Sequence, residues 1–400
     1  MKIGIIRETK TPPDSRVPLT PLQCKNLLAE YNNLDIVIQS STGRCYKDEE
    51  YKAQGIVFQE DMNDCDVLMG VKEVKKSTLI ADKTYFFFSH TIKAQPYNRD
   101  LLQLVLEKNI QLIDYETICN EKGSRVIAFG RWAGIVGAHN GILTWGRRTG
   151  NFELKTMNQC HDFAEAKSLY NNLPLGNPKI VLTGTGRVSN GSAEVLDEMG
   201  IRKINAEDFL TKKYDEAVYC QLKTNQLFAK GENNDFDSEF YNNPTDYHSI
   251  FAPYTQVADI MINGIYWDNK APAFFSKEDM KKDDFTIKVI ADITCDIAPE
   301  ASIPATLKAS TIPDPIFGYN VQEENECYPH KDGVVDMMTV DNLPNELPRD
   351  ASEDFGRQFS TYVLPELIKE NSEMIHKASI TKNGKLNEPY LYLTDYVNGK

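Results

Sequence analysis

Short apolar runs alternate with segments of helical period along the first third of the chain. Asp66–Val71, Tyr85–Phe88 and Ile110–Tyr115 are rich in β-forming residues and bounded by polar ones, so each predicts a buried strand. Tyr97–Lys108 lies between the last two, and its leucines recur at the spacing of an amphipathic helix. This alternation predicts an α/β domain with a mainly parallel sheet.

An ionisable residue follows each of these three strands. Lys72 follows the first, His90 the second, with Lys93 just beyond, and Glu116 the third. Parallel strands bring their carboxyl ends to one edge of the sheet, where open α/β folds bind ligands. A lone Lys or His is more often solvated or packed, and Glu116 fits a helix cap or an ion pair almost as well. Together, however, the three residues predict one site.

A second α/β unit starts at the strand Ile180–Thr183. The strand runs into Gly184-Thr185-Gly186 and then into a helix that contains Gly191. The spacing is G-x-G-x-x-x-x-G, two residues longer than G-x-G-x-x-G, but strand, glycine turn and helix follow in the order of a dinucleotide site. Such glycines allow a tight turn and let main-chain N–H groups approach a pyrophosphate at a helix N-terminus. An ordinary βα turn is the alternative.

The sequence leaves the choice between NAD and NADP open. The next predicted strand, Ile201–Asn205, should end on Asp or Glu if the ribose hydroxyls of NAD bind there. Glu207 and Asp208 come slightly late for this, and the cations Arg202 and Lys203 are nearby.

The remaining segments complete two such units. Val126–Arg148 predicts a strand-like start followed by a long helix, whose small residues allow another backbone to approach closely. Lys223–Asn243 is polar and Asn-rich, which predicts an insertion outside the core. Strands are predicted within Asp259–Tyr266 and Ile287–Thr294. The helix predicted at Asp354–Asn371 is expected to return to the first domain, and the polar tail after it to hold one short helix or strand.

Composition narrows the class of protein. With 400 residues, 41% of them hydrophobic and 26% charged, the chain fits two soluble domains. A net charge of −14 argues against nucleic acid or an anionic membrane as a partner. The chain has no apolar run of about 18 residues, and its first residues are charged too early for a signal peptide. The eight cysteines are scattered without a CxxC pair, so we expect reduced thiols in a cytoplasmic protein and no metal site.

Seven blocks in register carry a family resemblance. They are FFSHTIKAQ (Phe87–Gln95), LIDYE (Leu112–Glu116), RVIAFGRWAGIVG (Arg125–Gly137), GTGRVSNG (Gly184–Gly191), INGIYW (Ile262–Trp267), ADITCD (Ala291–Asp296) and TVDNLPNELPRDAS (Thr339–Ser352). These blocks resemble the lysine–ketoglutarate reductase domain of α-aminoadipic semialdehyde synthase. The layout is also similar to that of the lysine-forming saccharopine dehydrogenases and, more distantly, to alanine dehydrogenase.

The resemblance implies an α/β fold of two Rossmann-like domains with mainly parallel sheets and a cleft between them. Residues 1–135 with 351–400 would form the substrate domain, and residues 136–350 the dinucleotide domain. It implies that the side-chain amine of lysine condenses with 2-oxoglutarate to an imine, which hydride from NAD or NADP reduces to saccharopine in a reversible reaction. The oligomeric state stays open, because related folds assemble differently.

The resemblance also implies roles for individual residues. Lys72 and His90 match the acid/base pair, and Asp296 matches an Asp that faces the nicotinamide ring. Residues expected to bind substrate are Arg16, Lys93, Glu116 and Arg125, and those expected to bind the dinucleotide are Gly184, Thr185, Gly186, Arg187, Gly191 and Asp292. These residue types suit the chemistry, because imine formation needs groups that exchange protons near neutral pH and arginine binds carboxylates with two parallel hydrogen bonds.

Two other functions compete with this hypothesis. The first is alanine dehydrogenase, with ammonia and pyruvate as substrates; the chain length and the FFSHTIKAQ, INGIYW and DNLPNELP blocks favour the saccharopine enzymes over it. The second is a dinucleotide sensor without catalysis, against which the joint presence of Lys72, His90 and Asp296 argues.

Overall fold

The computed structural model describes residues 1–400, which form two compact units. Met1–Phe129 and Pro348–Lys400 make up the first unit, and Gly130–Leu347 the second. These limits differ by a few residues from the predicted division at 135 and 350. The second unit begins with the helix α4 (Gly130–Thr149) and ends just before the helix α10 (Pro348–Gln358). None of the helices is both long and apolar enough to cross a membrane.

The first unit is built on an eight-stranded sheet with the order β18-β17-β6-β5-β4-β1-β2-β3. Its strands are β1 (Lys2–Ile5), β2 (Asp35–Ile38), β3 (Val57–Phe58), β4 (Val67–Met69), β5 (Thr84–Phe86), β6 (Gln111–Ile113), β17 (Ser379–Lys382) and β18 (Lys385–Leu386). The first six pair in parallel, whereas β17 runs antiparallel to β6 and β18. The prediction of a mainly parallel sheet is therefore confirmed.

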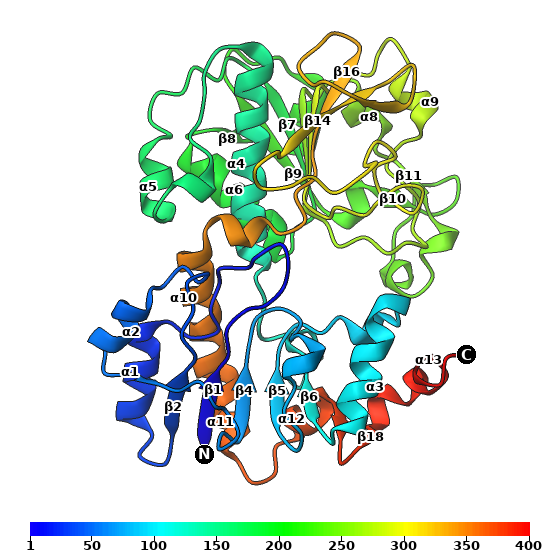
Figure 1. The fold of residues 1–400 in the computed structure, drawn as a ribbon. Helices are drawn as coiled ribbons and strands as arrows, with labels where there is room; N and C mark the ends of the chain where they lie inside the picture. Colours follow the sequence, from blue (N-terminus) through cyan, green and yellow to red (C-terminus); the bar gives the residue numbers. More distant parts are fainter. The chain divides into compact units, whose positions relative to one another are not determined.

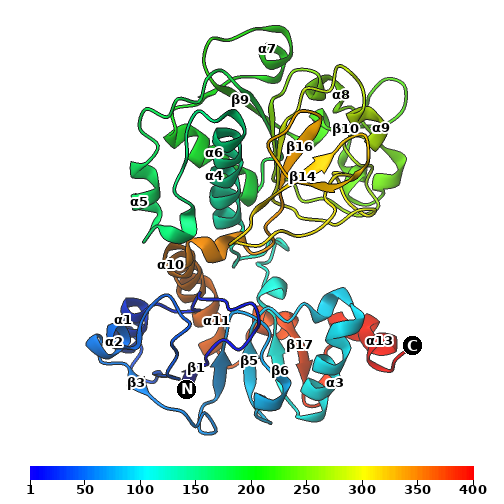
Figure 2. The same cartoon turned by 45° about the horizontal axis from the view of Figure 1, so that its top comes forward.

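Short helices flank this sheet. They are α1 (Pro21–Glu30), α2 (Asp48–Ala53), α3 (Arg99–Glu107), α10, α11 (Leu364–Ile368), α12 (Glu373–Ala378) and α13 (Thr394–Val397). Figures 1 and 2 show α1 and α2 at one end of the sheet and α3 with α13 at the other. The predicted amphipathic helix is α3, which buries Leu101, Leu102 and Val105. Each such side chain contributes about 1.5–3 kcal/mol through its burial.

The second unit contains another eight-stranded sheet, with the order β15-β14-β16-β13-β12-β7-β9-β8. Its strands are β7 (Lys179–Thr183), β8 (Arg202–Lys203), β9 (Val218–Leu222), β12 (Ile260–Asn263), β13 (Val289–Asp292), β14 (Ile316–Asn320), β15 (Asn325–Cys327) and β16 (Val334–Met338). The strand β14 runs antiparallel to both of its neighbours, β15 and β16, and the other neighbouring strands pair in parallel. The helices are α4, α5 (Phe163–Ser168), α6 (Arg187–Glu198), α7 (Ala206–Thr211), α8 (Ala252–Thr255) and α9 (Lys277–Met280).

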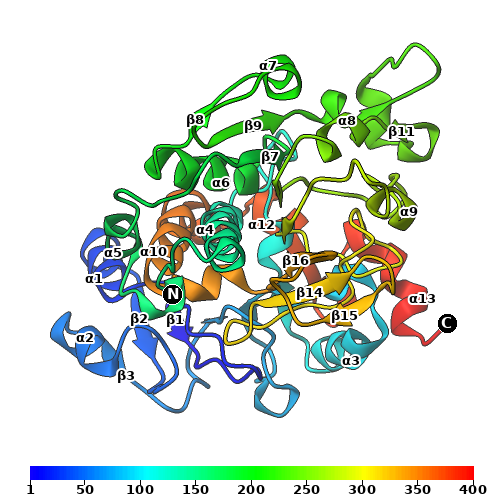
Figure 3. The same cartoon turned by 90° about the horizontal axis from the view of Figure 1, so that it is seen from above.

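The helices α4 and α6 pack with their backbones in contact, as the small residues predict. A Cβ atom on Gly134 would lie 1.8 Å from the carbonyl oxygen of Val188, and one on Gly191 would lie 2.1 Å from that of Arg131. Any larger side chain at either glycine would force the two helices apart. Figure 3 shows the pair side by side.

Several sequence predictions were wrong in detail. Val126–Phe129 forms no strand and is preceded only by an isolated bridge between Cys119 and Arg125. The strand predicted at Ile201–Asn205 is reduced to the two residues of β8, because Asn205 already caps α7.

The segment Lys223–Asn243 also differs from the prediction, since it contributes to the core. Phe228, in β10 (Phe228–Ala229), pairs with β11 (His248–Ser249) and stacks on Phe240 with ring centroids 4.9 Å apart. Both rings are buried in the main apolar cluster of the second unit. The prediction failed because the polar, Asn-rich composition of the segment outweighed these two aromatic residues.

The C-terminal part of the first unit is more structured than expected. The predicted helix Asp354–Asn371 starts six residues earlier, as α10, and continues through a π-helical turn, Phe359–Val363, into α11. The tail after it adds a helix, two strands and α13.

Candidate active site

The three ionisable residues that the sequence singles out follow adjacent strands. The strands β4, β5 and β6 are parallel neighbours, with Met69 opposite Phe86 and Phe86 opposite Ile113. Lys72, His90 and Glu116 therefore come after the carboxyl ends of consecutive strands, at one edge of the first sheet.

His90 is hydrogen-bonded to the carboxylate of Glu73, which the sequence analysis did not predict as a site residue. Its Nδ1 lies 2.6 Å from Oε1 of Glu73, whose other oxygen accepts from the Lys10 amine at 2.7 Å. Burial acts to raise the pKa of Glu73, but the hydrogen bonds from His90 and Lys10 outweigh it and lower that pKa to about 2. Glu73 is thus ionised at neutral pH. Its place directly after Lys72 was the only signal in the sequence.

Lys72 is a partly buried amine that forms no hydrogen bond or ion pair. Burial lowers its pKa, and the positive charge of Arg16 nearby lowers it further. Asp14 and Glu73 act in the opposite direction, more weakly than burial does. A lysine in such surroundings loses its proton more easily than one in water, which suits it for proton transfer.

Arg16 is buried, although it lies in a polar loop. It is only 3% exposed, and its Nε and Nη2 donate to the two oxygens of Asp14 at 2.9 and 2.6 Å. Its guanidinium also stacks over the ring of Phe129, 4.2 Å from the centroid. Asp14 was not anticipated from the sequence, and the pair fixes the fork of Arg16 in one orientation.

Glu116 and Arg125 form an ion pair close to Phe88, the ring that stacks near His90. Their closest charged atoms are 3.6 Å apart, and Arg125 lies 5.9 Å from the ring of Phe88, which stacks near His90 at 6.5 Å. Lys93, in the turn after His90, is exposed and makes no ion pair. The structure therefore brings Lys72, His90, Arg16, Glu116 and Arg125 to one region and leaves Lys93 at its margin.

In the second unit, the three glycines of the turn after β7 differ in their surroundings. Gly184 has φ +88°, and a Cβ there would lie 2.8 Å from Oγ of Ser189. At Gly186, by contrast, a Cβ would meet nothing within 4 Å, so there is open space beside the N-terminus of α6. Gly191 provides the contact with α4. A tight turn, an open approach and close helix packing are the three features that a pyrophosphate site needs.

The other candidate residues of the second unit are Thr185, Arg187, Asp292 and Asp296. Thr185 and Arg187 flank Gly186 at the start of α6. Asp292, at the end of β13, is fully buried, and its carboxylate accepts from Asn263, Thr294 and Thr306 at 2.6–2.9 Å. Burial raises the pKa of Asp292. It lies beneath the sheet edge and supports the loop that carries Asp296, which is only partly buried.

The strand order alters the expected ribose site. It is β9, not β8, that adjoins β7, with Leu182 opposite Gln221. Gln221 donates to the carbonyl of Gly184 at 3.2 Å and accepts from Lys203 at 2.7 Å. Glu207 and Asp208 instead begin α7, so they do not occupy the place beside the glycine turn.

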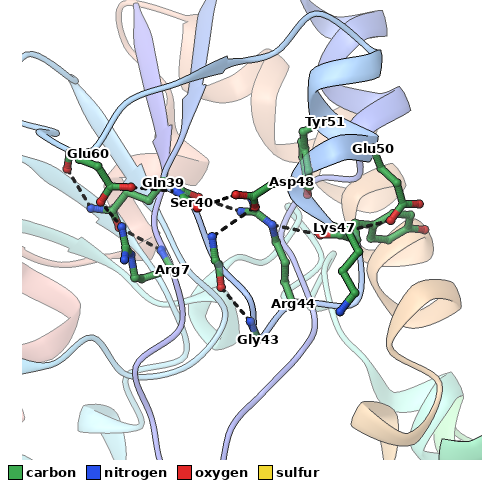
Figure 4. Close-up of polar contacts among 12 residues, drawn as sticks. Arg7, Gln39, Ser40, Gly43, Arg44, Lys47, Asp48, Glu50, Tyr51 and Glu60 are labelled. Atoms are coloured by element: carbon green, nitrogen blue, oxygen red, sulfur yellow. Dashed lines mark hydrogen bonds and ion pairs between the residues drawn. The ribbon is translucent and has the colours of Figure 1, made fainter.

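A second charged cluster in the first unit surrounds Arg44 (Figure 4). Its side chain is 4% exposed, and it donates to the carbonyls of Tyr46 and Gln39 at 3.1 and 3.0 Å and to the carboxylate of Asp48. Burial acts to raise the pKa of Asp48, but hydrogen bonds from Ser40 and Ser41 and the Arg44 charge lower it. Each of the three nitrogens of Arg44 donates a hydrogen bond, so this cluster holds the loop between β2 and α2.

Comparisons with known proteins agree with the sequence blocks. Residues 4–136 match the family "Alanine dehydrogenase/PNT, N-terminal domain". The chain is 30% identical to mitochondrial α-aminoadipic semialdehyde synthase of Mus musculus, over 98% of this chain and 47% of that protein. The chain thus spans about half the length of this relative. It is 24% identical to the saccharopine dehydrogenase [NAD(+), L-lysine-forming] of Emericella nidulans, over 96% of this chain and 97% of that protein.

The predicted family resemblance is confirmed. Among solved structures, an L-alanine dehydrogenase superposes with a TM-score of 0.69 at 16% identity, covering 99% of this chain and 100% of that one. This likeness shows that the chain shares the α/β fold of that enzyme.

Proposed function

We propose that the chain is an NAD- or NADP-dependent amino acid dehydrogenase that joins L-lysine and 2-oxoglutarate reductively to give saccharopine. The observation that carries this proposal is the cluster of Lys72, Glu73 and His90 at the edge of the first sheet. The resemblance to saccharopine dehydrogenases supports the choice of substrates. The proposed reaction needs groups that exchange protons with an amine and a leaving hydroxyl, and these residues can do so.

Each residue of the cluster has a proposed part in the proton transfers. Lys72, whose pKa burial lowers, accepts the proton that the side-chain ammonium of lysine must lose before it attacks the carbonyl carbon. His90 donates a proton to the hydroxyl that leaves as water when the imine forms. Glu73 orients the imidazole through Nδ1, which leaves Nε2 for the reacting groups.

Arg16 and Arg125 are the proposed binding groups for the substrate carboxylates. Both substrates carry carboxylates, and Arg16 is held by Asp14 with its guanidinium plane fixed against Phe129. Arg125 is paired more loosely with Glu116 and can exchange that partner for a substrate carboxylate. Lys93, exposed beside His90, adds positive charge.

The residues of the second unit fit a dinucleotide. Gly184, Thr185, Gly186 and Arg187 would hold its pyrophosphate at the N-terminus of α6, and Gly191 keeps that helix against α4. The bound cofactor supplies the hydride that reduces the imine carbon. Asp296 is the proposed neighbour of the nicotinamide ring, and Asp292 keeps the preceding strand end in place.

The test is the absorbance of reduced nicotinamide with lysine plus 2-oxoglutarate, run in parallel with NADH and NADPH. Oxidation that requires both substrates is the expected result, and the faster cofactor identifies the dinucleotide. Rapid oxidation with ammonia and pyruvate instead would contradict the proposal and favour alanine dehydrogenase. Dinucleotide binding without turnover of any amino acid would favour a sensor.

A further inference from the structure

Lys72 and His90 both lie on loops, so their positions depend on what holds the main chain. The strands before them end at Met69 and Phe86, and neither residue is part of a strand ladder. His90 has the left-handed values φ 54° and ψ 12°. A non-glycine residue keeps such a conformation only where the surrounding structure enforces it.

A carboxylate holds the Lys72 segment from one side. Glu8 lies on the chain that leaves β1, the neighbour of β4 in the sheet. Its Oε1 accepts from the main-chain N–H of Val71 at 2.5 Å, and its Oε2 from that of Lys72 at 3.0 Å. Both oxygens are thus used on two successive N–H groups.

A second carboxylate holds the His90 segment from the other side. Asp114 directly follows β6, the neighbour of β5. Its Oδ2 accepts from the main-chain N–H groups of Ser89 at 2.7 Å and His90 at 3.1 Å. Its Oδ1 accepts from the N–H of Glu116 at 2.8 Å, so the same side chain also sets the start of that candidate segment.

The two arrangements match in sequence and in space. In each, the N–H groups that are bound belong to the ionisable residue and the residue before it. The strands β1, β4, β5 and β6 are consecutive in the sheet, so the outer two strands supply the carboxylates and the inner two supply the residues that are held. A carboxylate with two N–H donors forms charge-assisted bonds that fix the direction of both peptide planes.

We propose, on the basis of the proposed function, that Glu8 and Asp114 are positioning residues that fix Lys72 and His90 in their reactive places. Neither side chain touches the reacting atoms. Burial raises the pKa of both carboxyls, that of Glu8 to about 7, and the main-chain N–H donors act against this rise because they stabilise the ionised form. Asp14 and Arg16 are the other charged groups that act on Glu8, and Glu116 acts on Asp114.

Hydrogen–deuterium exchange tests the holding without any need for turnover. In Glu8→Gln, the amide nitrogen must face the N–H of Val71 or Lys72, so exchange of a peptide covering both should become about tenfold faster or more. In Asp114→Asn, the amide nitrogen must face either Ser89 and His90 or Glu116, and the segment that it faces should exchange faster. Unchanged exchange in both variants would overturn the proposal.

Asp66→Asn is the matched control. Its carboxylate accepts from the main-chain N–H of Lys2 at 2.7 Å, at the opposite edge of the same sheet. Because only one of its oxygens accepts an N–H group, the asparagine amide can keep this bond through its oxygen, and exchange in both candidate segments should stay as in the wild-type protein. Glu8→Asp keeps the charge but withdraws it by one methylene, and it replaces Glu8→Gln if that variant fails to fold.

Kinetics then separate positioning from mere stability. We expect kcat to fall about 10–100-fold in Glu8→Gln and Asp114→Asn, with a KM for each substrate within about threefold and a displaced pH profile of kcat/KM, because small displacements of catalytic groups are costly. Asp66→Asn should change neither. Faster exchange with unchanged kcat and pH profile would overturn the positioning role. A wild-type protein that turns over nothing contradicts the proposed function instead, and the exchange result still decides whether the segments are held.

Discussion

The charged clusters around Arg44 and Lys72 both follow strand ends of the same sheet. They differ in whether the cation at their centre has hydrogen-bond partners. Arg44 uses its donors on two carbonyls and the carboxylate of Asp48. Lys72 is partly buried with no hydrogen bond to its amine, and its pKa is lowered as a result. A buried cation that is fully paired fixes a loop, whereas one left unpaired is costly to keep charged and is available for proton transfer. The difference in pairing therefore separates a structural cluster from a candidate catalytic one.

Removing the catalytic candidates gives the largest expected effect. Lys72→Met and His90→Gln should each lower kcat by a factor on the order of 10²–10⁴, the usual loss for a general acid or base. Lys72→Met should leave the melting temperature unchanged or raise it, because it removes a cation that has no partner. Steady-state kinetics with thermal unfolding measures both, and wild-type turnover in both variants would end the assignment.

The opposite result is expected at Arg44. Arg44→Met leaves the carboxylate of Asp48 without its guanidinium, which should lower the free energy of unfolding by about 3–5 kcal/mol. The KM values should stay the same, since the nitrogens of Arg44 are already bonded within the loop. Urea unfolding and kinetics below the transition test this. A raised KM without loss of stability would instead assign Arg44 to the substrate site.

A smaller effect is expected at Arg16. Arg16→Lys keeps the charge but loses the two-pronged contact with Asp14, so the KM for a carboxylate substrate should rise about tenfold with kcat little changed. Lys47→Arg, at an exposed cap outside the candidate site, is a suitable control. A fall in kcat alone would mean that Arg16 does not bind the substrate carboxylate.

The smallest effect is a pH dependence of stability at Glu73. Its pKa of about 2 lies below the ordinary value of 4.5, so its contribution to stability is present above about pH 4.5 and is lost as the pH falls toward 2. Glu73→Gln should therefore be less stable than the wild type at pH 7, and the difference should shrink as the pH falls. Unfolding curves at pH 7, 5 and 3 measure it; a difference that stays constant would show that Glu73 is not held as a carboxylate.

The sequence was enough to predict that these strand ends share one edge of the sheet, but not which carboxylates support the candidate site. Apolar runs that end in Lys72, His90 and Glu116 predict a shared edge because strand direction follows from the alternation with helices. Glu8, Glu73 and Asp114 sit among many other acidic residues, and which of them faces a buried N–H group depends on packing between distant strands. The sequence also did not show that β9 lies between β7 and β8. A strand of only two residues, such as β8, has too few positions for a recognisable apolar pattern.

The pairing of β17 with β6 has a consequence for the order in which the protein is made. During synthesis β6 leaves the ribosome early, whereas β17 follows only after the whole second unit has been made. Until then the edge of β6 lacks its final partner. Thr381 then closes that edge by bonding both Ile110 and Leu112. The second unit, continuous in the chain, can fold during this interval. An unpaired edge strand is where another chain can add, so the first unit is open to aggregation until β17 has been synthesised.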